Sequence, residues 1–80
     1  MEAFSKVKID PQKNILKQIR QALGMTQEEF ARAIKAHQVS VARWETSRSR
    51  PSLNIAQIKA LEREMAKIGL SFADLPDDLN

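Results

Sequence analysis

The sequence contains no cysteine and only one histidine, which excludes several classes of protein at once. Without cysteine there is no disulfide, no thiolate nucleophile and none of the common zinc-finger patterns. The single histidine, His37, cannot build a histidine-rich metal site, so we expect neither a metal nor another cofactor. No apolar run approaches the roughly eighteen residues of a membrane span, and no cleavable apolar segment opens the sequence. We therefore expect a cytoplasmic protein without a membrane partner.

Two sequence features typical of enzymes, a phosphate-binding loop and carboxylates that converge on a pocket, are also missing. There is no glycine-rich phosphate loop, and the carboxylates fall at predicted helix starts or on exposed helix faces, with no sign that they converge on a pocket. We expect no separate ligand-sensing domain beside the single small core. We expect neither an enzyme nor a small-molecule ligand.

The charge is unevenly distributed along the chain. Residues 1–59 hold eleven Lys and Arg against five Asp and Glu, a net +6, whereas residues 60–80 hold two against five, a net −3. A basic body suits a surface turned toward a polyanion. A mixed solvated surface explains the total of +3 equally well, so charge alone does not decide the function.

Apolar periodicity predicts an all-α, compact five-helix domain over residues 11–80, preceded by an arm over residues 1–10. The arm carries Phe4, Val7 and Ile9 without a helical period. Such an apolar segment can fray, dock on its own domain or add a strand to a partner.

The first helix is predicted to begin at Asp10 and Pro11, since Asp suits the N-cap and Pro the first helical position. Gly24 is predicted to end it in the left-handed conformation. Between them lies a stripe of apolar residues at helical spacing, which we expect to be buried: Ile15, Leu16, Ile19 and Leu23.

Two short helices joined by a tight link are predicted over about 26–46. Thr26 and Glu29 form a capping box that opens the first of them. The second runs roughly from Gln38 to Thr46 and is followed by a polar, basic loop over residues 46–52.

A fourth helix is predicted from Ser52 or Asn54 up to Gly69, and a last short helix from Ser71, ending near Pro76. The apolar residues of the fourth helix are spaced like a short coiled-coil seam. This stripe serves either the domain's own core or a dimer, and it consists of Ile58, Leu61, Met65 and Ile68.

The helix over 38–46 carries the functional signal. At about 100° per residue, Val41 and Trp44 share one side and can pack on Phe30 and Ile34. The opposite side presents residues that suit the major groove of DNA: Gln38, Val39, Ala42 and Arg43.

Each residue of that side has a chemical partner on a base edge. Arg43 can donate two hydrogen bonds to guanine, Gln38 can pair with adenine, and Val39 can contact the methyl group of thymine. Ala42 keeps the helix slim enough to enter the groove. A plain solvated face is the alternative for each of these residues.

Several fixed spacings together resemble the Cro and lambda-repressor type of helix-turn-helix, also called the xenobiotic response element family. The similarity covers residues 15–75. Its markers are Leu23-Gly24-Met25-Thr26-Gln27-Glu28-Glu29-Phe30-Ala31, then Val41-Ala42-Arg43-Trp44-Glu45, then Arg50-Pro51-Ser52-Leu53.

The resemblance implies a role for each matching position. Gln38, Val39, Ala42 and Arg43 would read bases, and Arg20 and Glu45 would form an ion pair between the first and third helices. Gln27 would touch a phosphate and buttress Gln38. The residues expected at the DNA backbone are Gln27, His37, Ser40, Ser47, Arg48 and Arg50.

The sequence departs from the family pattern in three places. His37 stands where the family usually has a Ser or Thr cap, which weakens the cap. Lys35 occupies a turn position where Gly is common, so either it takes a positive φ at a cost of roughly 1 kcal/mol or the turn has a different shape. The fourth helix is longer than usual between Pro51 and Gly69, which leaves the dimer geometry open.

We therefore expect a nucleoid-associated transcriptional regulator, a repressor that binds double-stranded DNA as a homodimer on a palindromic operator. Two alternatives belong to other classes. One is an antitoxin that binds a toxin protein and also represses its own operon. The other is a protein-interaction module of the same fold without a DNA function, against which Gln38 and Arg43 argue.

Overall fold

A computed structural model describes residues 7–76, and these contain four α-helices and no strand. The helices are α1 (Ile15–Ala22), α2 (Gln27–Ala33), α3 (Gln38–Glu45) and α4 (Ile55–Ala66), followed by a short 3-10 helix, η1 (Phe72–Asp74). The all-α prediction is confirmed, but within this described range the α-helices number four rather than the predicted five. None of those in residues 7–76 is both long and apolar enough to cross a membrane.

The predicted fifth helix is only the 3-10 turn η1. Pro76 follows closely, and proline forces the residue before it into an extended conformation. Leu75 has this conformation, with φ −97° and ψ 155°. One turn is therefore all that fits between Ser71 and Pro76.

The predicted start of the first helix at Asp10 and Pro11 is wrong, because Asp10 caps a separate turn. Its Oδ1 accepts a hydrogen bond from the Gln12 amide at 2.9 Å, and its carbonyl accepts one from the Lys13 amide at 3.1 Å. The N-cap of α1 is Asn14, whose Oδ1 accepts from the Lys17 amide. Asp and Pro favour turns as well as helix starts, and the sequence does not separate the two.

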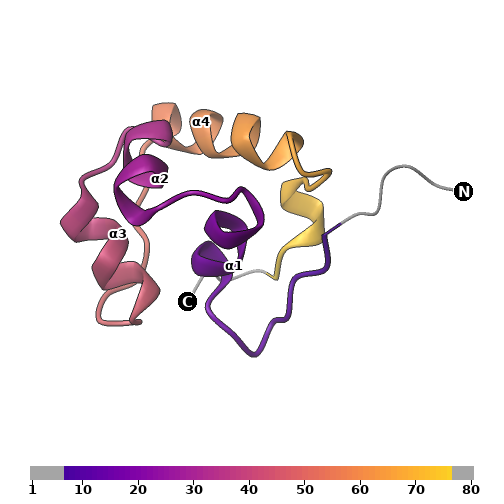
Figure 1. Ribbon diagram of the computed structural model, residues 1–80, viewed down its shortest axis with the longest axis horizontal. Helices are drawn as coiled ribbons and strands as arrows, with labels where there is room; N and C mark the ends of the chain where they lie inside the picture. The colour runs from indigo at the N-terminus through magenta and orange to yellow at the C-terminus, as the bar shows by residue number, and fades with distance from the viewer. Residues whose placement is uncertain (1–6, 77–80) are drawn as a thin grey trace, which may run out of the picture.

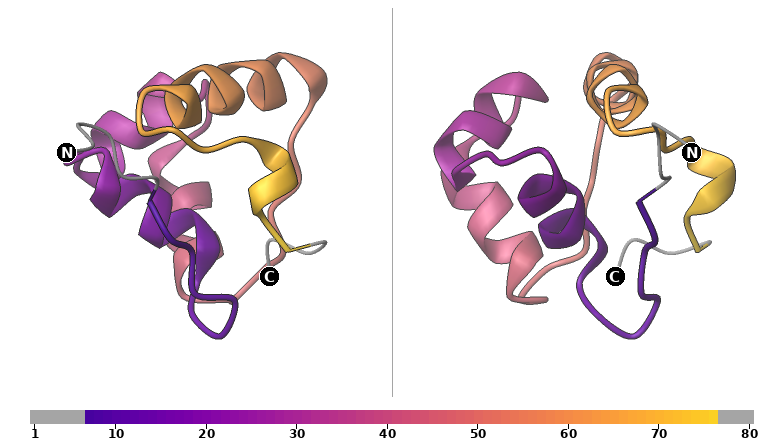
Figure 2. Two further views of the ribbon diagram at one scale, coloured as in Figure 1. Left: turned by 90° about the vertical axis from the view of Figure 1, so that its right-hand side faces the viewer. Right: turned by 45° about the vertical axis from the view of Figure 1, so that its right-hand side comes forward.

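The helices surround one small core. Figure 1 shows α1 near the centre, α2 and α3 together on one side and α4 across the top; in both views of Figure 2 the segment from α3 to α4 climbs the height of the molecule. All four helices and the residues next to them contribute to the core. Its buried members are Ile15, Leu16, Ile19, Phe30, Ala31, Ile34, Val41, Trp44, Leu61, Met65 and Leu70.

Two apolar segments left open by the sequence can now be placed. In α4, Leu61 and Met65 are fully buried in the domain's own core, whereas Ile58 is 39% exposed. In the described part of the arm, Val7 and Ile9 pack against the same core. Phe4 lies outside the described residues.

Two or three residues beyond the end of each α-helix described here, a residue with positive φ reverses the chain. After α2 this residue is Lys35, with φ 61°. Its amide donates to Arg32 O at 3.2 Å, and the next amide, of Ala36, donates to Ala31 O at 2.8 Å. This is the Schellman pattern, which satisfies the last carbonyls of a helix. The equivalent residues after α1, α3 and α4 are Gly24, Ser47 and Gly69.

We expect Lys35→Gly to stabilise the fold by about 0.5 to 1 kcal/mol, because glycine takes a positive φ without a Cβ penalty. The measurement is urea unfolding of the variant and the parent protein. Gly24→Ala is the matched control, because an added Cβ would meet nothing within 4 Å and only the φ of 72° opposes it. That control should lose about 1 kcal/mol. A loss of stability in Lys35→Gly would contradict the strain argument.

Candidate nucleic-acid interface

The turn between α2 and α3 fixes where α3 begins. Besides the reversal at Lys35, the Lys35 carbonyl accepts a hydrogen bond from Gln57 Nε2 of α4 at 3.0 Å. Gln57 also completes the capping box of α4 with Asn54. The turn is thereby attached to a third helix, which the sequence did not indicate.

One side of α3 is buried in the protein. Val41 is fully buried and Trp44 nearly so, and both belong to the core cluster that contains Phe30 and Ile34. Glu45 is buried as well. The short helix is therefore held through this inner side.

The opposite side of α3 is open to solvent. Gln38, Val39 and Arg43 are exposed, with Val39 at 65%, and Ala42 is half-buried among them. Val39, Ala42 and Arg43 line a shallow open hollow together with Thr46 and Arg48. The predicted base-reading residues thus lie on one accessible surface, which continues into the following loop.

A buried carboxylate ties the end of α3 to α1 and α2. Glu45 Oε2 lies 2.7 Å from Arg20 Nε, and Glu45 Oε1 lies 3.0 Å from Arg20 Nη2, so the ion pair is bidentate. Arg20 Nη1 also donates to Met25 O at 2.9 Å. The Glu45 side chain is only 3% exposed. The buried carboxylate therefore depends on Arg20 for its opposite charge.

Gln27 joins this cluster rather than standing free. Its Nε2 donates to Glu45 Oε1 at 3.1 Å, and the side chain is partly buried. The bond links the first residue of α2 to the last residue of α3. Gln27 therefore lies beside the end of α3, where its side-chain amide binds Glu45.

The loop after α3 is basic and exposed. Arg48 and Arg50 are both exposed and, within residues 7–76, neither has an ion-pair partner. Ser47 adopts φ 60°, and the amide of Arg48 donates to Arg43 O at 2.9 Å, so the loop leaves α3 by a tight reversal. Sequence reasoning missed this positive φ because a serine gives no such signal.

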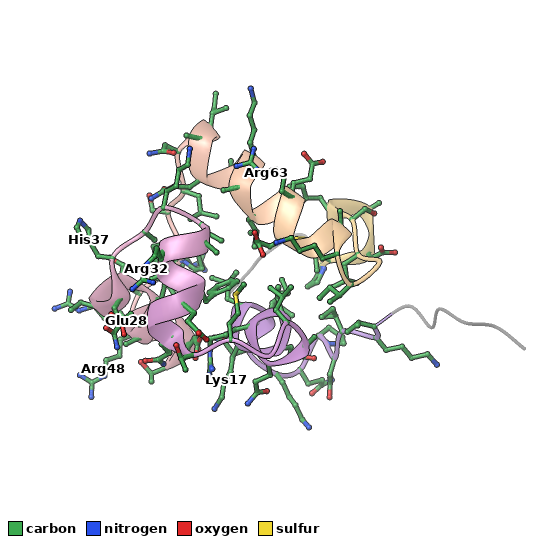
Figure 3. The ribbon with its side chains drawn as sticks, turned by 45° about the horizontal axis from the view of Figure 1, so that its top comes forward. Lys17, Glu28, Arg32, His37, Arg48 and Arg63 are labelled. Carbon is green, nitrogen blue, oxygen red and sulfur yellow. The ribbon has the colours of Figure 1, made fainter. Side chains whose placement is uncertain are left out.

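The start of α3 carries His37 as its N-cap. The His37 side chain makes no capping hydrogen bond and is exposed, while Ser40 is half-buried one turn later. Figure 3 shows His37 and Arg48 projecting from the α3 side of the molecule and Arg63 extending from α4 in another direction. Among residues 7–76, no three His, Asp or Glu side chains gather as a metal site would require.

Removal of Arg20 should unfold the domain or destabilise it by about 3 to 5 kcal/mol, because it leaves the buried Glu45 carboxylate unpaired. Thermal unfolding of Arg20→Ala measures the loss. Arg32→Ala is the matched control: Arg32 pairs with Glu28 at 3.4 Å, but both side chains are more than 60% exposed. That control should cost less than about 1 kcal/mol. Similar losses in the two variants would contradict the role given to burial.

The comparisons with known proteins agree with this geometry. The Helix-turn-helix family model matches residues 16–60, more than half of the chain and all of α2 and α3. This is a family of DNA-binding transcription regulators, which are generally not enzymes. Searches of curated proteins and of solved structures returned no match. The chain belongs to the helix-turn-helix family of the Cro and lambda-repressor type.

Proposed function

We propose that the protein binds specific sequences of double-stranded DNA with the outward side of α3 and represses transcription as a homodimer on a palindromic operator. The observation that carries this proposal is the division of α3 into two sides. Val41 and Trp44 are buried, whereas Gln38, Val39 and Arg43 face solvent. A helix held by one side and free on the other fits the width of the major groove.

The chemistry of the free side matches base edges. Arg43 donates two hydrogen bonds to O6 and N7 of guanine, and Gln38 pairs with N6 and N7 of adenine. Val39, exposed and apolar, contacts a thymine methyl group. Ala42, lying between these residues, lets the helix approach the bases closely.

Residues around α3 hold the DNA backbone in this proposal. Arg48 and Arg50 lack partners in the described protein and are free to bind phosphates, and the exposed His37 lies at the start of α3. Gln27, Ser40 and Ser47 supply polar groups nearby. Such contacts fix the position of the protein, whereas the base contacts supply specificity.

A homodimer follows from how little DNA one α3 reaches. An eight-residue helix contacts only a few base pairs, which is too short a site for specificity in a genome. Two copies on half-sites about one helical turn apart, roughly 34 Å, double the number of bases read. Selection of bound sequences from random DNA tests this directly: we expect an inverted repeat, and a lack of any enriched sequence would contradict the proposal.

A second candidate is an antitoxin that also represses its own operon. Ile55 is 70% exposed and Ile58 39% exposed on α4, one turn apart, which offers a toxin protein two neighbouring apolar side chains to cover. Purification under native conditions separates the candidates. A second, neighbour-encoded protein that remains bound supports the antitoxin, whereas a clean homodimer supports the simple regulator.

Arg43→Ala should lower affinity for the selected site by about 1 to 3 kcal/mol and relax the choice of base at one position. The reason is the loss of two hydrogen bonds to one guanine. Binding to the selected site and to single-base variants of it, measured by fluorescence anisotropy, checks both effects. An unchanged base preference would show that Arg43 does not contact a base in the major groove.

Arg48→Ala should weaken binding to all sequences alike and reduce the slope of log affinity against log salt by about one. A salt titration with selected and scrambled duplexes provides the measurement. Arg63→Ala is the matched control, because it removes the same charge from the exposed surface of α4. If the two variants behaved alike, the loop that carries Arg48 would have no particular role in binding the DNA backbone.

A further inference from the structure

The side chain of Asn14 joins the start of α1 to the end of α3. Its Oδ1 accepts from the Lys17 amide at 2.9 Å, which caps α1. Its Nδ2 donates to Trp44 O at 2.7 Å, across thirty residues of sequence. The oxygen and the nitrogen of this side-chain amide thus make two different hydrogen bonds. Only the bond accepted by the oxygen is needed to begin a helix.

The carbonyl that Asn14 binds lies in the last turn of α3. Trp44 O also accepts from the Ser47 amide at 3.2 Å, within the reversal that ends the helix. The next residue, Glu45, is held by Arg20 and Gln27. The end of α3 therefore has two separate attachments to α1: one through the backbone at Trp44 and one through the carboxylate at Glu45.

The start of α3 is held through the turn before it and not by a side-chain cap. His37 makes no side-chain capping bond, and the turn before it contains the strained Lys35. With the start attached through the turn, the attachments at Trp44 and Glu45 fix the other end of α3 and so its angle on the domain. A bidentate contact to a base needs the reading side chain within about half an ångström of its ideal place.

We propose that Asn14 is a positioning residue for DNA reading: it fixes the angle of α3 through Trp44 O and does not touch DNA itself. This inference rests on the proposed function, which supplies the contacts that the angle serves. Loss of the Nδ2 donor should disturb the base contacts of Arg43 and Gln38 while leaving phosphate attraction intact. Specific binding then falls and nonspecific binding does not.

Asn14→Ser separates this role from capping. Serine caps a helix about as well as asparagine, so α1 keeps its start, but its shorter side chain carries no group that reaches Trp44 O. Asn54→Ser is the matched control. Asn54 caps α4 in the same way, with Oδ1 accepting from the Gln57 amide at 2.8 Å, but it has no bond to α3.

The first measurement is the ratio of affinities for the selected duplex and a scrambled duplex of the same length. For Asn14→Ser we expect this ratio to fall about five- to tenfold, as for one lost hydrogen bond, with scrambled-duplex affinity unchanged. Asn54→Ser should keep the parent ratio. An unchanged ratio in folded Asn14→Ser would overturn the inference.

Amide hydrogen exchange gives a second measurement that needs no DNA. Asn14→Ser should speed exchange at the Ser47 and Arg48 amides, which bond to the last carbonyls of α3, and leave the capped Lys17 amide protected. Faster exchange at Lys17 alone would mean that Asn14 is only a cap. If the parent protein prefers no sequence, the proposed function fails, while the exchange pattern still decides whether Asn14 holds α3.

Discussion

The proposed function of this protein depends on holding a two-turn helix by one side only. An isolated helix of eight residues is not stable in water, so α3 exists because Val41 and Trp44 are buried and Glu45 is paired with Arg20. These contacts all lie on the inner side of the helix. The outer side is left without a structural duty, so it is free for the contact with DNA that we propose.

The hold on α3 comes from elements spread along the chain. Arg20 and Asn14 in or beside α1 grip its end, Gln27 adds a bond from the first turn of α2, and Gln57 of α4 holds the turn before it. Because these bonds come from three helices, α3 cannot shift without disturbing each of them. Substitutions far from the outward surface are therefore expected to alter DNA reading.

Local signals in the sequence predicted much of the fold. The capping box at Thr26 and the left-handed end at Gly24 are confirmed, because each depends on residues close in sequence, and of the two shapes left open for the turn at Lys35 the structure has the one with positive φ. The start of α1 was placed too early, since Asp10 closes a turn of its own. The bonds of Asn14 and Gln57 were not predicted, because they join positions 30 and 22 residues apart. Which residues contact DNA remains a prediction.

Methylation of guanine N7 and adenine N3 by dimethyl sulfate tests the central claim most directly, because the first atom lies in the major groove and the second in the minor groove. On the selected duplex, bound protein should protect guanine N7 at the base that Arg43 reads, and the Arg43→Ala variant should lose that protection. Protection of adenine N3 alone, or of no base, would show that the outward side of α3 does not enter the major groove.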